Sequence, residues 1–218
     1  MTAPRPLSPE AFARELTDIA AALPPGARYL AAIAGPPGGG KSTLVEGLEA
    51  AFRARFGDTP DPVAILPMDG FHYDDELLTR LGRQARKGAP DTFDVGGFRA
   101  TLARLAANTE DSVAVPRFDR SIEIARAAAR LIHRETPMVL VEGNYLLLDE
   151  PPWDMLRDAF DLTAMIMVEE PVLRERLTAR WVELGLAPDE VMRKVETNDL
   201  PNGRHVYAAS RPADIAIV

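Results

Sequence analysis

A glycine-rich run at residues 35–42 has the clearest chemical meaning in the sequence. It reads Gly-Pro-Pro-Gly-Gly-Gly-Lys-Ser and fits the pattern G-x-x-x-x-G-K-[ST] at every fixed position. In such a loop the backbone N–H groups converge on a phosphate, and the helix that follows adds its positive end. Lys41 is expected to reach the β- and γ-phosphates, and the Ser42 hydroxyl is expected to bind Mg²⁺. The predicted nucleotide contacts are Gly35, Pro36, Pro37, Gly38, Gly39, Gly40, Lys41, Ser42 and Thr43.

Two acidic residues stand directly after short apolar runs. Asp69 follows residues 63–68, and Glu142 follows residues 138–141. A carboxylate in the position of Asp69 can accept the proton of an attacking hydroxyl, although an Asp-Gly pair is also a common turn. An acid in the position of Glu142 can orient a metal ion or its water, or it is an ordinary residue at the end of a strand. Ser42 and Glu142 are therefore the predicted metal-binding residues.

Arginine is concentrated in a helical stretch in the last quarter of the chain. Arg176 and Arg180 are four residues apart and share a helix face, whereas Arg174 points elsewhere. Arginines above a transferring phosphoryl group stabilise its charge, and a mobile segment that carries them excludes water. The alternative is a solvated helix face paired with nearby glutamates. A second basic group, Arg80, Arg83, Arg86 and Lys87, is interpreted as a solvated loop.

Short apolar runs alternate with helical patterns along most of the chain. Uninterrupted apolar strands separated by helices predict a parallel sheet that is covered on both faces. Ligands of such sheets bind beyond the carboxyl ends of the strands, where the glycine-rich run, Asp69 and Glu142 all fall. The predicted strands are residues 29–34, 63–68, 113–115, 138–141, 162–168 and 215–218.

Composition excludes several classes of protein. The 218 residues favour one domain, and the absence of cysteine excludes a disulfide framework, a thiolate metal site and a cysteine nucleophile. A formal net charge of −8 argues against binding to nucleic acid or anionic lipid. No apolar run is long enough for a membrane span, and the first ten residues lack the apolar centre of a secretory signal. We expect a cytoplasmic protein without membrane insertion or a nucleic-acid partner, and a homodimer stays open.

Six sequence motifs, taken in their order along the chain, make the sequence resemble the phosphoribulokinase/uridine kinase group of P-loop kinases. This group includes the bacterial type of pantothenate kinase. The resemblance covers about residues 28–205. Within that group, the sequence looks most like bacterial proteins described as fructose transport system kinases or nucleoside/nucleotide kinase-like proteins. The motifs are Gly35 to Ser42, Met68 to His72, Lys87 to Asp94, Pro116 to Arg120, Val141 to Leu148 and the arginine helix.

The resemblance implies a three-layer α/β P-loop NTPase fold, with a central, mostly parallel sheet and a short helical lid. It would be a single domain over residues 1–218, with an N-terminal helix within 1–26 and the lid at about 172–202. Asp69 matches the catalytic aspartate of the family, assisted by Lys41 and by the lid arginines Arg174 and Arg180. Asp91 matches an acid that binds acceptor hydroxyls. The implied substrate-binding residues are Asp69, His72, Asp91, Phe118, Arg120 and Asn144.

The chain departs from the uridine kinases at one of these motifs. Phe118 stands where they carry a tyrosine, and Arg120 stands where a histidine follows, which argues against pyrimidine nucleoside recognition. No Asn-Lys-x-Asp motif for guanine occurs, so ATP with Mg²⁺ is the expected donor. The expected activity is transfer of the γ-phosphoryl group to a hydroxyl of a small polar metabolite. A sugar ranks first, before a nucleoside or a pantothenate-like alcohol. The alternative is an NTP-binding regulatory or transport accessory protein that hydrolyses slowly and has no phosphoacceptor.

Overall fold

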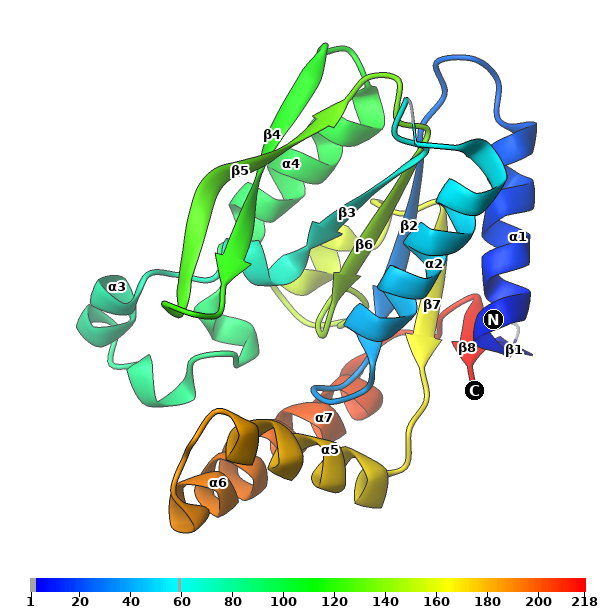
Figure 1. The fold of residues 1–218 in the computed structure, drawn as a ribbon. Helices are drawn as coiled ribbons and strands as arrows, with labels where there is room; N and C mark the ends of the chain where they lie inside the picture. Colours follow the sequence, from blue (N-terminus) through cyan, green and yellow to red (C-terminus); the bar gives the residue numbers. More distant parts are fainter. Residues whose placement is uncertain (1–2, 59) are drawn as a thin grey trace.

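Six parallel strands form the central sheet of the protein (Figure 1). A computed structural model describes residues 3–58 and 60–218, so residues 1 and 2 of the predicted N-terminal segment lie outside the described residues. The strand order β1-β8-β7-β2-β6-β3 confirms the predicted α/β class. The strands are β1 (Arg5–Leu7), β2 (Tyr29–Ala34), β3 (Val63–Pro67), β6 (Met138–Gly143), β7 (Leu162–Ile166) and β8 (Ile215–Ile217).

Both faces of this sheet are buried, which explains why its strands are apolar without interruption. In β2, the side chains of Ala31 and Ile33 pack on one face and those of Leu30 and Ala32 on the other. Helices α1 (Pro9–Ala22) and α2 (Lys41–Phe56) cover the first face, and α4 (Val95–Ala107) covers the second (Figure 1). The three layers place the carboxyl ends of the central strands at a shared edge.

Side-chain caps fix where two of these helices begin. The Ser8 hydroxyl accepts a hydrogen bond from the Ala11 N–H at 3.2 Å, at the start of α1. The Asp94 carboxylate accepts one from the Gly97 N–H at 2.8 Å, at the start of α4. Such caps satisfy backbone donors that have no partner within the helix.

The segment after residue 111 differs from the sequence-based expectation. The prediction of a short strand at 113–115 is corrected by a longer strand, β4 (Ser112–Asp119), which pairs antiparallel with β5 (Ile124–His133). These two strands form a separate sheet that stands beside α4 (Figure 1). Strand β5 escaped the sequence analysis because most of it is exposed and it has no apolar alternation. Strand β1 was missed as well, because it has only 3 residues.

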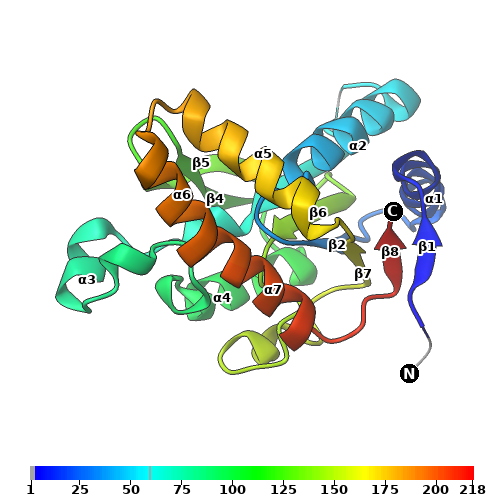
Figure 2. The same ribbon diagram turned by 90° about the horizontal axis from the view of Figure 1, so that it is seen from below.

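Helices α5 (Glu170–Glu183), α6 (Pro188–Lys194) and α7 (Leu200–Ala209) lie beyond the carboxyl ends of the strands (Figures 1 and 2). A π-helical turn, Val195–Asp199, joins α6 to α7. The segment has its own small apolar cluster, formed by Leu173, Leu177, Val191, Val195 and Leu200. Helix α3 (Asp75–Arg80) lies near the tip of the β4–β5 hairpin (Figure 1). No helix within the described residues has the length and apolar character of a membrane span.

Trp153 connects the turn at residues 90–92 to the core, and its removal should destabilise the folded protein. It is 1% exposed, and its Nε1 donates a hydrogen bond to the Pro90 carbonyl at 3.0 Å. We expect Trp153→Ala to lower the free energy of unfolding by about 3–5 kcal/mol, because a large cavity replaces the indole. Urea unfolding measures the loss. The control Met155→Ala, at an exposed position of the 3-10 turn Trp153–Leu156, should lower the free energy of unfolding by less than about 0.5 kcal/mol. Equal losses in the two variants would contradict this account.

Candidate functional site

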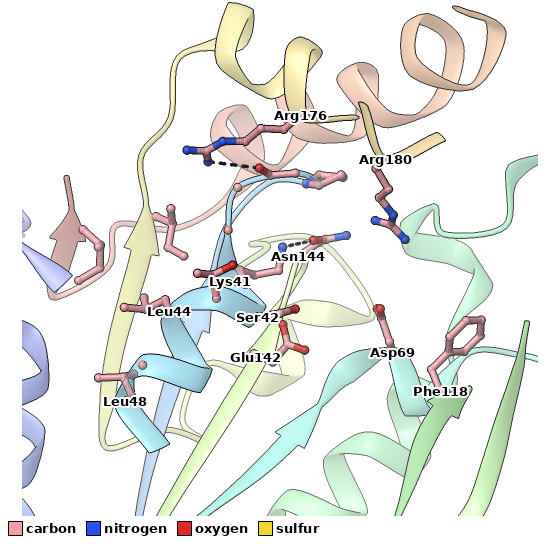
Figure 3. A pocket seen from close by; sticks show the side chains of 18 of the residues that line it. Lys41, Ser42, Leu44, Leu48, Asp69, Phe118, Glu142, Asn144, Arg176 and Arg180 are labelled. Carbon is pink, nitrogen blue, oxygen red and sulfur yellow. Dashed lines mark hydrogen bonds between the residues drawn. The ribbon is translucent and has the colours of Figure 1, made fainter. Parts of the chain in front are cut away.

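A cavity of about 1390 Å³ opens where the strand ends, the β4–β5 hairpin and the α5–α7 segment meet (Figure 3). Its lining includes most of the glycine-rich loop, the residues that follow β3 and β6, and polar side chains from the helices above. The cavity also continues into a groove between α1 and α2, which is lined by Ala13, Leu44, Leu48, Ala51 and Ile217. One space therefore adjoins both the phosphate-binding loop and the predicted acids.

The glycine-rich loop connects β2 to α2. At the start of the helix, Gly40 has a φ of 89°, a left-handed conformation in which glycine avoids the strain of a side chain. The Lys41 Nζ donates hydrogen bonds to the carbonyls of Gly35 at 3.1 Å and Pro36 at 3.0 Å. It also donates to the Asn144 Oδ1 at 2.6 Å (Figure 3). Three oxygen atoms from two neighbouring strand ends thus fix the position of the lysine.

Lys41 and Glu142 are half-buried charged residues that depend on each other. Burial lowers the pKa of Lys41, whereas the nearby Glu142 and Asp69 carboxylates raise it. Burial raises the pKa of Glu142, and the Lys41 ammonium opposes that rise. A buried charge without a partner is strongly destabilising, so each of the two groups stabilises the other in its ionised form.

Ser42 and Glu142 lie close together beneath the loop (Figure 3). A hydroxyl and a carboxylate are the hard oxygen ligands that suit Mg²⁺. This ion keeps several waters and is usually held by one or two protein groups together with substrate phosphates. The residues present therefore fit Mg²⁺ bound jointly with a nucleotide.

Asp69 faces the cavity from a 3-10 turn, Met68–Phe71, that directly follows β3. A Cβ atom on Gly70 would lie 2.8 Å from the Pro116 carbonyl oxygen, so glycine permits the hairpin to pack directly on this turn. The hairpin in turn delivers Arg120, whose Nη2 lies 2.8 Å from the Asp69 Oδ2. Asp69 therefore lies in a turn, as an Asp-Gly pair predicts, and its carboxylate also faces the cavity, as a proton acceptor would require.

Aromatic side chains form a wall next to Asp69. The His72 ring lies 4.0 Å from the Phe93 ring and 5.0 Å from the Phe118 ring, measured between centroids. The Lys87 Nζ lies 5.4 Å from the centroid of Phe118, within the range of a cation–π interaction. Burial lowers the pKa of His72, which favours the neutral imidazole.

The α5–α7 segment contributes two arginines to the cavity, Arg176 and Arg180 (Figure 3). The Arg176 Nη1 donates a hydrogen bond to the Gly38 carbonyl at 3.5 Å. Burial lowers the pKa of Arg180, and the positive charge of Arg120 lowers it further. The charges of Arg120 and Arg180 also lower the pKa of Lys41. Three cations thus stand close enough to repel one another around the cavity.

The structure brings most of the predicted site residues together in the cavity lining and leaves four outside it. Asp91 makes ion pairs with Arg83, at 3.3 Å, and with Arg86, and it does not line the cavity. Arg174 pairs with Glu170 and Glu196, also away from the cavity. The carbonyls of Gly35 and Pro36 hold Lys41 instead of facing the cavity. The lining includes Pro37, Gly38, Gly39, Gly40, Lys41, Ser42, Thr43, Asp69, His72, Phe118, Arg120, Glu142, Asn144 and Arg180.

Sequence reasoning missed a polar group that the π-helical turn and its flanks place over the cavity. The Trp181 Nε1 donates a hydrogen bond to the Asp199 Oδ2 at 2.7 Å, and burial raises the pKa of Asp199. The run Asn198-Asp199-Leu200-Pro201-Asn202, polar and next to a proline, was an available signal. The missed lining residues are Lys87, Trp181, Lys194, Asn198, Asp199 and Asn202.

Comparison with known proteins places the chain among kinases, although no family model matches it. A candidate uridine kinase of Schizosaccharomyces pombe is 35% identical over 181 residues, which cover 80% of this chain and 76% of that protein. The crystal structure of a candidate fructose transport system kinase from Silicibacter sp. TM1040 is 37% identical. It superposes with a TM-score of 0.86 over 97% of this chain and 100% of the other. A pantothenate kinase of Rhodopseudomonas palustris is 30% identical over 162 residues, 72% of this chain and 50% of that protein.

The lowered pKa of His72 predicts a loss of stability in acid. Its ordinary value is 6.5, so just below that pH the unfolded chain binds a proton that the folded chain does not. The free energy of unfolding should therefore fall as the pH drops from about 7 to about 5, and it should fall less steeply in His72→Gln. The slopes should differ by at most about 1.4 kcal/mol per pH unit. Urea unfolding across this range measures them, with His133→Gln, exposed on β5, as the control. Parallel profiles for the parent and His72→Gln would contradict the prediction.

Proposed function

The chain belongs to the P-loop kinases of the phosphoribulokinase/uridine kinase type, and we propose that it transfers the γ-phosphoryl group of ATP to a hydroxyl of a small polar metabolite. The main support is that a single cavity adjoins both the phosphate-binding loop with Lys41 and the carboxylate of Asp69. A protein that only binds nucleotide has no need of a carboxylate aimed into the same space. We further propose that the reaction takes place in the cytoplasm.

Asp69 accepts the proton of the acceptor hydroxyl as its oxygen attacks the γ-phosphorus. The bond from this phosphorus to the bridging oxygen breaks, and that oxygen leaves with ADP. Lys41 neutralises charge on the β- and γ-phosphates, for which it exchanges its carbonyl partners for phosphate oxygens. Ser42 and Glu142 would hold Mg²⁺, which supplies further charge compensation at the same phosphates.

The arginines above the cavity complete the charge compensation. Lys41, Arg120 and Arg180 disfavour one another's charges, and the negative charge of a transferring phosphoryl group relieves that repulsion. We propose that the region of about 172–202 closes as a lid that excludes water during transfer. Arg180 and Arg176 are the lid arginines that this arrangement favours, since both line the cavity.

The nucleotide base fits the groove between α1 and α2. The groove continues from the glycine-rich loop, and Leu44, Leu48 and Ile217 give it an apolar lining. A purine ring buries its flat apolar faces well against such side chains. The triphosphate then extends from this groove across the loop toward Asp69.

The acceptor that we rank first is a sugar. The support is the description of the 37% identical relative from Silicibacter as a candidate fructose transport system kinase. A nucleoside and a pantothenate-like alcohol rank next, from the descriptions of two other relatives. Hydroxyl-rich compounds of this kind suit a site with an aromatic wall and charged side chains, Phe118 and Arg120 among them.

Release of ADP in the presence of candidate acceptors tests the proposal. A panel of sugars, nucleosides and pantothenate should contain at least one compound that raises ADP release well above the basal rate. With that compound, Asp69→Asn should lower turnover by about 10²–10⁴-fold, because the amide cannot accept the proton. Its affinity for ATP, measured by calorimetry, should change little.

Two outcomes would contradict these roles. If no compound of the panel raises ADP release above slow basal hydrolysis, the result would favour the alternative of an NTP-binding regulatory or transport accessory protein. Loss of ATP binding with intact turnover in Asp69→Asn would make Asp69 a metal-site residue instead of a base. The variant should fold, because its partner Arg120 is half exposed and is left in contact with water.

Arg180 and Arg174 provide a matched pair of variants on one helix. Arg180→Ala should lower turnover by about 10- to 100-fold, because it removes a charged donor from the cavity. Arg174→Ala should stay within about twofold, since exposed ion pairs contribute only about 0.3–0.5 kcal/mol. Steady-state ADP release measures both, and thermal unfolding checks the folding of each variant. A large loss in Arg174→Ala would return that residue to the catalytic role predicted from the sequence.

A further inference from the structure

A second cavity, of about 600 Å³, lies between the turn at Gln84–Arg86 and the end of α6 with the π-helical turn. Four cationic side chains line it: Arg86, Lys87, Arg193 and Lys194. No aspartate or glutamate of the described residues belongs to its lining. The chain as a whole has a net charge of −8, so a cavity lined by cations differs in sign from the protein around it.

Two of these cations form no ion pair within the described residues, although the Asp199 carboxylate interacts electrostatically with Lys194. Arg86 pairs with Asp91, and the Lys87 Nζ lies 2.6 Å from the Asp75 Oδ1, although both carboxylates lie outside the lining. Arg193 and Lys194 form no ion pair within the part of the chain that the structure describes. The Lys194 Nζ instead lies 4.4 Å from the centroid of the Trp181 ring. Among the described residues, every charged side chain of the lining is therefore a cation, while Asp91 and Asp75 offset Arg86 and Lys87 from outside it.

The second cavity adjoins the first on its acceptor side. Lys87, Lys194, Asn198 and Asn202 line both spaces, whereas no residue of the glycine-rich loop lines the second. The triphosphate on its loop therefore does not account for these cations. The sequence-based interpretation of the basic group as a solvated loop fits Arg80 and Arg86, which are exposed, whereas Lys87 is half-buried and lines both cavities.

We propose that this second cavity binds an anionic group, a phosphate or a carboxylate, on the acceptor whose hydroxyl faces Asp69. Arginine forms paired hydrogen bonds with both groups, and the lysines and amides add donors around them. The inference rests on the proposed function and narrows its substrate class. The acceptor is then a sugar phosphate or a polyhydroxy acid, and neither a neutral sugar nor a nucleoside.

Binding of inorganic phosphate tests the site without any turnover. The protein is first saturated with Mg²⁺ and the non-hydrolysable ATP analogue AMP-PNP, so that the glycine-rich loop is occupied. Calorimetric titration with phosphate should then show binding to the parent. Arg193→Gln and Lys194→Gln should each weaken it by about tenfold, because a charge-assisted contact is lost. Arg99→Gln, which removes an exposed arginine from α4 outside both cavities, should leave the affinity unchanged.

The absence of phosphate binding, or equal binding in the parent and all three variants, would overturn the inference. Arg193 is exposed, so its replacement should not unfold the protein, and thermal unfolding of each variant checks this. Because the titration needs no phosphoryl transfer, its result does not depend on whether the proposed kinase activity is correct.

ADP release with matched acceptors distinguishes the two kinds of anion. The pairs are fructose with fructose 6-phosphate, for a phosphate, and glucose with gluconate, for a carboxylate. The anionic member of one pair should have a kcat/KM at least about tenfold above that of its neutral partner. Arg193→Gln should remove this preference by raising KM with little change in kcat. A neutral sugar that serves as well as its anionic partner would overturn the inference while supporting the proposed function. Four inactive compounds with intact phosphate binding would count against the proposed function alone.

Discussion

The hydrogen bonding of the half-buried Lys41 ammonium is the interaction on which the site depends. Its oxygen partners come from the ends of β2 and β6, and the parallel pairing of these strands sets Ile33 opposite Glu142 and Ala34 opposite Gly143. This register brings Asn144 level with the start of the glycine-rich loop. A shift of one residue would turn Glu142 to the other face of the sheet and leave Lys41 without its nearest opposite charge. The packing of two apolar strands thus determines the electrostatics of the site.

Around this fixed pair, the remaining charged groups come from elements outside the central sheet. The β4–β5 hairpin contributes Arg120, and α5 contributes Arg180. Repulsion between these cations and Lys41 is opposed by the Glu142 and Asp69 carboxylates, which act on Lys41 more strongly, and phosphate oxygens would add further charge compensation. The ion pair between Arg120 and Asp69 also occupies one oxygen of the carboxylate and leaves the other oxygen without this arginine.

Sequence alone was sufficient for the parts of the molecule that obey local rules. The glycine pattern predicts its own loop, and continuous apolar runs predict β2, β3 and β6, so the positions of Asp69 and Glu142 at strand ends follow. Strand β5 could not be predicted, because Ala-Arg-Ala-Ala-Ala-Arg at 125–130 does not alternate large apolar with polar side chains, and its partner strand β4 is recognised only in the structure. On α5, the buried stripe of Leu173 and Leu177 would have favoured Arg180, which lies three residues beyond Leu177, whereas Arg174 and Arg176 flank that stripe on opposite sides and could not be told apart.

The central sheet and the elements outside it hold different parts of the cavity lining. The phosphate-binding loop, Lys41 and Glu142 are fixed by the six parallel strands, and their geometry cannot change without disturbing the core. The opposite side of the cavity is lined by the β4–β5 hairpin, the 84–92 turns and the π-helical turn, which lie outside the central sheet although the hairpin joins the core through Val113, Val115 and Ile132. A π-helical turn holds one residue more per turn than an α-helix, and here it adjoins both cavities with Asn198. Substitutions at exposed positions of these outer elements can alter the lining of the cavity while the strand register that holds Lys41 stays as it is.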